Sequence, residues 1–508
     1  MPKQIRRLRP SGGLISDILA WEVGDDYYTR LRNVLMRSGF ATRVPGSRQA
    51  YDGLSTSPLH IQNVAPLGIN YWVYFGSDEI FAVDGALVHS DLSPTLTPVA
   101  SPYQWSTTAL NGIPCANNTV DEPMYWDGDV SHNYATLTDW PSGVTADFIT
   151  AHRFHLFAFS ITDSVKNPHL VMWSDAAEPG AIPASWTPAA DNEAGSASLS
   201  QTPGRIVTAK TLRDSLLVYK NSSAYAFDYT GDPISAFSVR GLWSRAGALT
   251  PHSVADINGK HIVVSDGDIL LNDGFSEPQS IANFKVRRFL FDQLDPTNYQ
   301  NLFVVYNPTF GEVWIFFPQT GSEFSSVALV WNIQSDSWGY VEAENPTAHA
   351  STGSLNDEEP STAWEDDDEA WEDDDTPWFS INITSATESL LLAEPTTDML
   401  RVLGVSTPTA RNGLIAHYGL PFDDPERIKF IRQAHIRGSF GTLYVRVGSQ
   451  MFPDGPTTWS TEVTVTSPTQ PIPLFTQGRF ISYEVRSTDT VQWIVTGIDF
   501  EYEMRGYF

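Results

Sequence analysis

The segment from Phe303 to Ala343 alternates short runs of β-branched and aromatic residues with breaks that contain Asn, Pro, Asp and Gly. The runs are FVVYNP, GEVWIFF, SSVALVWNI and SWGYVEA, and the breaks fall at NPTFG and QSD. Pleated strands favour residues of the first kind, and hairpin turns favour the second. The segment therefore predicts two β-hairpins, which together make one four-stranded blade of a β-propeller.

Similar segments recur at intervals of roughly 40–50 residues, the spacing of propeller repeats. They predict an all-β protein with a propeller of roughly six blades. The segment Ser280–Asp295 lies between the fifth and sixth units, and its apolar spacing fits a short helix and a loop ending in a strand equally well. The six units cover residues 60–90, 105–130, 148–175, 205–243, 253–274 and 303–343.

The pattern changes near the C-terminus, where FISYEVR and GIDFEYEMRG alternate strictly between apolar and polar residues. Such alternation is typical of antiparallel strands with one buried and one exposed face, and it predicts a small β-sandwich. We therefore divide the chain into an N-terminal arm with a first strand (1–50), a propeller (51–405) with an acidic insertion near 355–378, a linker (406–424) and a C-terminal β-sandwich (425–508).

Composition narrows the possible functions of this 508-residue chain. It carries 60 acidic and 31 basic residues, a net charge of −29, which gives a general nucleic-acid-binding role no electrostatic support. The single cysteine, Cys115, excludes an intramolecular disulfide framework and fits a reducing cytoplasm. No apolar run approaches the roughly 20 residues of a membrane helix, and the N-terminus lacks a signal-peptide pattern, so we expect a soluble protein without a membrane segment.

The tandem TAWEDDDEAWEDDDTPW is the sharpest local feature. Blocks of like charge are usually solvated surface loops. A loop at a channel would instead keep a passing polyanion from adhering, and carboxylates can also bind divalent cations. Tryptophans Trp364, Trp371 and Trp378 are candidate anchors for this loop. The candidate channel or gate carboxylates are Asp357, Glu358, Glu359, Glu365, Asp366, Asp367, Asp368, Glu369, Glu372, Asp373, Asp374 and Asp375.

The few basic residues form three groups. In an acidic assembly such groups are natural partners for the acidic faces of neighbouring subunits, although ordinary surface solvation accounts for any one of them. The candidate subunit or adaptor contacts are Arg6, Arg7 and Arg9, then Lys285, Arg287 and Arg288, and finally Arg427, Lys429, Arg432 and Arg437.

No arrangement of residues indicates catalysis. Phosphate-binding and dinucleotide-binding glycine motifs are missing from the sequence, and the many carboxylates single out no catalytic pair. His152 and His155, placed on one expected strand, would point to opposite faces and make poor co-ligands. We therefore expect a non-enzymatic protein with no catalytic residues, no cofactor and no metal.

The order of these segments resembles the tail hub, or nozzle, proteins of short-tailed bacteriophages, a group that includes packaged-DNA stabilisation proteins and tail tubular protein B. The resemblance extends over nearly the whole chain, from GGLISDI and YYTRLRNVLMRSGFATRVPG through DEPMYWDGD to the closing GRFISYEV and GIDFEYEMRG. Its most specific part is FKVRRFLFDQLD followed by NLFVVYNPTFGEVWIFFP and ALVWNIQSDSWG, in Phe284–Gly339.

The resemblance implies a structural protein of the virion tail, assembled in the bacterial host cytoplasm. Its copies would form a homohexameric ring below the portal and its adaptor (the head-to-tail connector), next to tail fibre or needle proteins. The ring would extend the DNA channel, retain the packaged genome and let double-stranded DNA pass during ejection without stable binding. The alternative is a carbohydrate-binding receptor-recognition or depolymerase propeller of the virion, which the sixteen tryptophans would suit.

Overall fold

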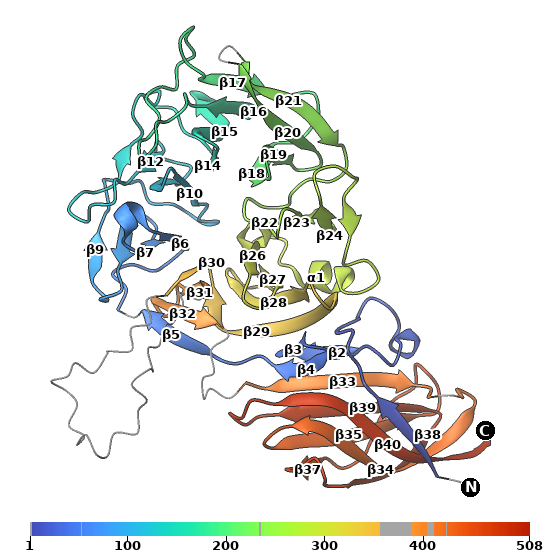
Figure 1. The fold of residues 1–508 in the computed structure, drawn as a ribbon. Coiled ribbons are helices and arrows are strands. Elements are labelled where there is room, and N and C mark those ends of the chain that lie inside the picture. The colour runs from blue at the N-terminus through green and yellow to red at the C-terminus, as the bar shows by residue number, and fades with distance from the viewer. Residues whose placement is uncertain are drawn as a thin grey trace, which may run out of the picture.

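The computed structural model describes residues 3–51, 53–232, 235–355, 388–403, 411–422 and 424–507. Within them, strands form a ring of four-stranded blades and, beside it, a pair of packed sheets (Figure 1). The first and last strands, β1 (Gln4–Leu8) and β40 (Ile494–Tyr507), pair with each other in this second module. No helix in the described part of the chain is long and apolar enough to cross a membrane.

The first four blades follow one another along the chain, each a meander of antiparallel strands. The first strand of each blade faces the centre of the ring, and the following strands lie successively farther out (Figure 1). The strands are β6 (His60–Val64), β7 (Tyr71–Phe75), β8 (Ile80–Val83) and β9 (His89–Asp91); β10 (Ser106–Leu110), β11 (Ile113–Asn117), β12 (Met124–Tyr125) and β13 (Ala135–Thr136); β14 (Phe148–His152), β15 (His155–Asp163), β16 (Val165–Trp173) and β17 (Gly195–Ser198); β18 (Ile206–Leu212), β19 (Ser215–Lys220), β20 (Ala224–Asp232) and β21 (Ser235–Trp243).

Three further blades complete the ring. Their strands are β22 (Val254–Asp256), β23 (His261–Ser265), β24 (Asp268–Asn272) and β25 (Gln279–Ser280); β26 (Phe303–Asn307), β27 (Glu312–Phe317), β28 (Ser325–Asn332) and β29 (Ser337–Thr347); and β30 (His349–Ser354), β31 (Glu388–Glu394), β32 (Met399–Leu403) and β5 (Ser47–Tyr51). The expected all-β propeller is confirmed, and the segment 303–343 forms the sixth blade as predicted. The described strands, however, make seven blades where the sequence pattern indicated roughly six.

The seventh blade cannot be recognised by counting repeats along the sequence, because its strands come from distant parts of the chain. Its outer strand β5 precedes the first blade, whereas β30, β31 and β32 follow the sixth. Leu403 of β32 is paired with Ser47 of β5, and Arg401 donates hydrogen bonds to Ser47 across 354 residues of sequence. Mixing early and late strands in one blade closes the ring with backbone hydrogen bonds, so that neither edge of the propeller is left open.

The second module is the expected β-sandwich. Strands β1, β3 (Val34–Arg37), β4 (Phe40–Arg43), β34 (Arg427–Ser439), β38 (Ile472–Gly478) and β40 lie in one sheet, and β2 (Arg30–Arg32), β33 (Gly413–Leu420), β35 (Leu443–Gln450), β36 (Thr458–Trp459), β37 (Val463–Val465) and β39 (Phe480–Ser487) form the other. Inward side chains such as Ile415, Val485 and Phe500 are fully buried in one core.

The N-terminal segment belongs to this sandwich and does not form a separate arm. Besides the pairing of β1 with β40, β2 pairs with β33, and β4 pairs with β40. We expected residues 406–424 to be a linker, yet β33 occupies most of the described part of that range. Strands β1 to β4 are three to five residues long, and each has a partner hundreds of residues away, so local alternation of residue types did not reveal them.

One continuous β-sheet, which we call the junction ladder, joins the sixth blade to the sandwich. Sheet order runs from β26 through β29 to β3, β4, β40, β34 and β38 without a break. The Asn33 amide donates to the carbonyl of Tyr340 at 2.8 Å, and the Asn33 side chain accepts from the amide of Glu342 at 2.8 Å. Asn33 has a φ of 54°, a left-handed conformation that asparagine tolerates better than most residues.

The helix α1 (Arg287–Gln293) forms within the segment that fitted a helix or a loop. Its buried residue Leu290 joins the core that blade strands and sandwich strands share, together with Leu329 and Ile431. Three short 3₁₀ turns complete the helical structure described: Ala20–Glu22, Pro66–Gly68 and Tyr299–Asn301. The two modules are therefore connected by a common apolar core as well as by the ladder.

Gly339 provides a test of the junction. A Cβ atom there would lie 2.9 Å from the carbonyl oxygen of Val34 and would overlap the Leu35 side chain. Gly339→Ala should lower the free energy of unfolding by about 1–3 kcal/mol, the usual cost of overpacking. Gly24→Ala is the matched control, since its Cβ would have no neighbour closer than 4.0 Å. Equal urea midpoints for the two variants would contradict close packing between β29 and β3.

Candidate functional site

The predicted acidic gate lies outside the described residues. All twelve carboxylates and the three candidate anchors Trp364, Trp371 and Trp378 fall within residues 356–387. The described strands before and after this segment, β30 and β31, belong to the seventh blade. The role of the acidic tandem therefore stays a prediction.

Most of the predicted basic contact residues interact within their own chain. The clearest cases lie on the sandwich, where Arg9 and Arg437 both pair with Asp499, at 2.8 and 2.9 Å. The others are Arg6 with Asp25, Lys285 with Asp336, Arg287 with Asp268, Arg432 with Glu503, Lys429 with the carbonyls of Asp424 and Arg479, and Arg427 with the carbonyl of Arg505. These side chains hold strands together, which a count of basic residues in sequence could not show.

Arg7 and Arg288 differ from this group. Both side chains are exposed, and neither has an ion pair with the described residues. Arg7 lies on β1 and Arg288 on α1. Of the ten candidate contact residues, these two carry the untested prediction of a contact with another subunit or the adaptor most directly.

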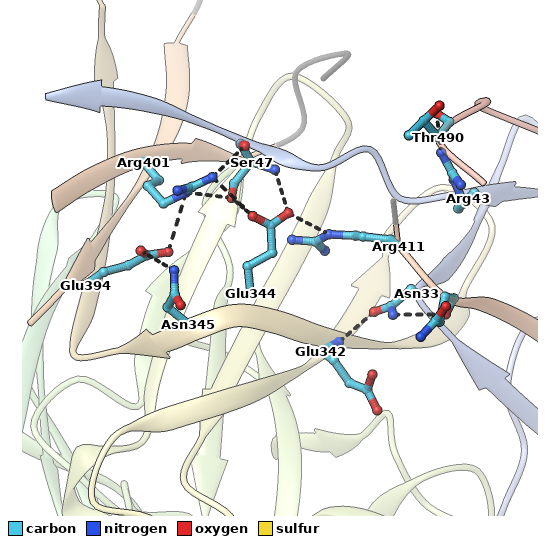
Figure 2. Close-up of polar contacts among 11 residues, drawn as sticks. Asn33, Arg43, Ser47, Glu342, Glu344, Asn345, Glu394, Arg401, Arg411 and Thr490 are labelled. Carbon is cyan, nitrogen blue, oxygen red and sulfur yellow. Dashed lines mark hydrogen bonds and ion pairs between the residues drawn. The ribbon is translucent and has the colours of Figure 1, made fainter. Parts of the chain in front are cut away.

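A cluster of partly buried charged side chains lies where the ring closes and the chain enters the sandwich (Figure 2). Glu344 of β29 accepts hydrogen bonds from the amide and hydroxyl of Ser47, at 3.1 and 2.8 Å. The same carboxylate pairs with Arg401 at 3.1 Å and with Arg411 at 3.2 Å. Three parts of the chain, β5, β32 and the segment before β33, thus meet at one side chain. We call Glu344, Ser47, Arg401 and Arg411 the closure clamp.

The electrostatics of the clamp favour an ionised Glu344. Burial alone would raise the pKa of Glu344, but the hydrogen bonds from Ser47 and the charge of Arg411 outweigh it, so the pKa lies below its ordinary value. The neighbouring Glu394 behaves oppositely: burial raises its pKa despite hydrogen bonds from Asn345 and Thr397. One carboxylate in the cluster is therefore held charged, while the other is biased towards its neutral form.

The propeller has a central channel of about 650 Å³, lined by the first strands of all seven blades. Its walls carry hydroxyl side chains, including Thr107, Thr150, Thr208 and Thr352, and one lysine, Lys210. This volume is typical of a small-molecule pocket. It is far too small for a DNA duplex.

Cys115, His152 and His155 are engaged in the fold. Cys115 is fully buried, and burial raises the pKa of its thiol to about 12, which leaves no thiolate for nucleophilic attack. His152 and His155 do not share one strand as we expected: a turn at Arg153 and Phe154 makes them register partners across a hairpin. His152 bonds to Thr211 and His155 to Glu193, both at 3.0 Å.

Comparison with known proteins adds little about function. No family profile matches the chain, and no curated protein matches it. Among solved structures, the chain is similar to YCF48 bound to D1 peptide, with a TM-score of 0.38, 10% identity, and coverage of 71% of this chain and 97% of that chain. The WD40 β-propeller domain of Doa1 gives a TM-score of 0.38, 8% identity and the same two coverages. Likeness at this level carries no functional argument, and the propeller assignment stands on the sheet topology.

Sequence reasoning missed the closure clamp and three channel histidines, His60, His252 and His349. The clamp residues stand alone in the sequence, and only the pairing of β5 with β32 brings them together. The histidines share a position at or just before the first strand of a blade. An alignment of the seven blades with one another would have revealed that shared position.

Replacing Glu344 tests the clamp. Glu344→Gln keeps the side-chain shape but leaves Arg401 and the buried Arg411 without their shared carboxylate, so the free energy of unfolding should fall by about 2–4 kcal/mol at pH 7. The pKa of Glu344 is lower in the folded state than in the unfolded state. The wild type is therefore more stable than Glu344→Gln above the unfolded-state pKa of about 4.3, and it loses this extra stability as the pH falls through the folded-state pKa.

Glu342→Gln is the matched control on the same strand. Glu342 is 41% exposed and lies 3.9 Å from Arg32, so its loss should cost less than about 0.5 kcal/mol. Denaturant titrations at pH 7 and pH 3 would measure both variants. A Glu344→Gln penalty that is small at pH 7, or that persists unchanged at pH 3, would contradict the account.

Proposed function

We propose that the chain is a structural subunit of a short-tailed bacteriophage tail, a nozzle or hub protein that forms a ring around the DNA path. The observation that carries this proposal is the resemblance in order and motif along nearly the whole chain, strongest in Phe284–Gly339. That segment includes α1 and the sixth blade up to the strand that joins the sandwich. A motif that specifies a junction between modules supports an architectural role more than a catalytic one.

Charge and geometry support the same role. A subunit with a net charge of −29 repels DNA at close range, and screening limits that repulsion to about 8 Å at physiological salt. The channel of a single propeller cannot hold a duplex, so copies would surround the DNA with their outer surfaces. Six copies below the portal adaptor would extend the channel, hold the packaged genome and let it slide out without adhesion.

The alternative, a carbohydrate-binding propeller, loses its main argument from sequence. Sugar stacking requires exposed aromatic faces, yet every tryptophan among the described residues is buried or half-buried. Trp72, Trp126 and Trp314, for example, are packed inside blades. The tryptophan content therefore gives this alternative little support, although single exposed aromatic side chains such as Phe275 and Phe475 do occur.

Cryo-electron microscopy of the purified tail tests the proposed function. We expect a six-fold ring of this chain directly below the adaptor, with an open path wide enough for duplex DNA between subunits. Residues 356–387 should approach that path if the acidic tandem has the gating role. A peripheral position for the chain, as in a fibre or spike, would refute the nozzle function.

Assembly with the purified adaptor in solution allows two charge-reversal variants to be compared. Arg288→Glu should weaken this assembly by about tenfold or more if α1 faces an acidic surface of the adaptor. Lys260→Glu makes the same charge change at another exposed site, in the turn after β22, and should assemble normally. Analytical ultracentrifugation would measure the assembled fraction, and equal behaviour of both variants would remove Arg288 from the interface.

A further inference from the structure

Three histidines from separate blades converge at one end of the central channel. His60 begins β6 of the first blade, His349 begins β30 of the seventh, and His252 lies two residues before β22 of the fifth. One ring nitrogen from each histidine lies within 4.8 Å of the other two. The ring centroids of His60 and His349 are 3.9 Å apart, and His252 lies 5.4 and 5.2 Å from them.

Contacts behind the rings orient the side chains. The His60 Nε2 atom is 2.9 Å from the hydroxyl of Thr107, so Nδ1 has the free lone pair when Nε2 carries the proton. His252 is hydrogen-bonded to the backbone of Trp105. The amide of Ile61 contacts Nδ1 of His349 at a long 3.5 Å, which a metal bond could replace. Histidines that bind metals are commonly held by such outer partners.

The surroundings keep the three rings neutral. Burial lowers the pKa of His252 to about 4, and the nearby charge of Lys210 lowers it further. Burial also places the pKa values of His60 and His349 well below the ordinary value. Metal binding requires neutral imidazole, so these ligands need not lose protons at neutral pH.

We propose that His60, His252 and His349 form a binding site for a divalent transition metal ion of the zinc class. Three imidazoles with a fourth position open to the channel are a known ligand set for Zn²⁺. Zn–N bonds of about 2.0–2.1 Å require ligand nitrogens about 3.4 Å apart, so the rings have to close by roughly an ångström. Side-chain rotation at the mouth of a 650 Å³ channel can supply that movement.

The bound ion would connect blades on both sides of the ring closure. His349 belongs to the blade built from early and late strands, His60 to the next blade, and His252 to the blade two positions before the closure. A metal held by all three would resist separation of β30 from β6. Binding only to the folded ring should raise thermal stability in proportion to metal concentration.

The experiment uses the purified full chain after treatment with a chelator. Isothermal titration with Zn²⁺ at pH 7.5 should give one ion per chain, and the melting temperature should rise with added Zn²⁺. Co²⁺ as a second probe should give the visible absorption of a low-coordinate nitrogen site. No stoichiometric Zn²⁺ binding together with a Co²⁺ spectrum of the fully hydrated ion would overturn the proposal.

Substitution of the proposed ligands tests whether the ion binds at the three histidines. His252→Asn and His349→Asn should each lower Zn²⁺ affinity by more than about 100-fold, since loss of an outer partner alone costs about 10–100-fold. His132→Asn is the control, because His132 is 62% exposed beside Asp127 and is not among the residues that line the channel. Unchanged binding in the channel variants, or loss of binding only in His132→Asn, would overturn the proposal. The Co²⁺ spectrum of wild type remains decisive if a variant fails to fold.

Lys210 distinguishes a metal site from an anion site in the same channel. Lys210→Met removes a positive charge near His252 and His349, so it should strengthen Zn²⁺ binding several-fold by relieving repulsion. An anion such as inorganic phosphate would respond in the opposite sense. Phosphate binding that is lost in Lys210→Met, without any Zn²⁺ binding in wild type, would assign the channel to anions and refute the metal site.

Discussion

The backbone ladder that runs from β29 through β3 and β4 to β40 is the constraint on which the rest of the structure depends. Because β3 and β4 each pair on two sides, the sixth blade and the sandwich cannot move apart without breaking buried hydrogen bonds. The apolar core is shared as well, with Leu329 of the blade and Ile431 of the sandwich in one cluster. Two modules that look separable in sequence therefore form one body.

The same early part of the chain completes both modules. Strands β1 to β4 supply the sandwich, and β5 supplies the outer strand of the seventh blade. The closure clamp adds charge to this arrangement, because Glu344 binds Ser47 from the beginning of the chain and Arg401 and Arg411 from its later part. Contacts this distant in sequence are slow to form, so folding of the whole chain depends on its ends meeting. This strongly acidic protein pairs many of its few cations with its own carboxylates, mostly at partly exposed positions.

Sequence patterns predicted the strands whose partners are near in the sequence and missed those whose partners are far away. Alternation and turn residues were sufficient for the sixth blade, because all of its strands lie within Phe303–Thr347. These signals failed for the seventh blade, for the N-terminal strands and for the expected linker, each of which includes a pairing between residues hundreds of positions apart. The candidate site shows the same limit: Arg432 and Arg437 look like free contact residues in sequence, yet each lies opposite a carboxylate on β40. The channel histidines became visible only when the ring brought three blades together.

Native-state hydrogen exchange can show whether propeller and sandwich unfold as one cooperative unit. The amide of Asn33 donates to Tyr340, and the amide of Arg43 donates to the carbonyl of Trp493, so these two report the junction. The account predicts that both exchange only by global unfolding, with the same free energy as core amides of β28. Exchange of the junction amides at a much lower free energy than those of β28, with separate melting of the two modules, would contradict it.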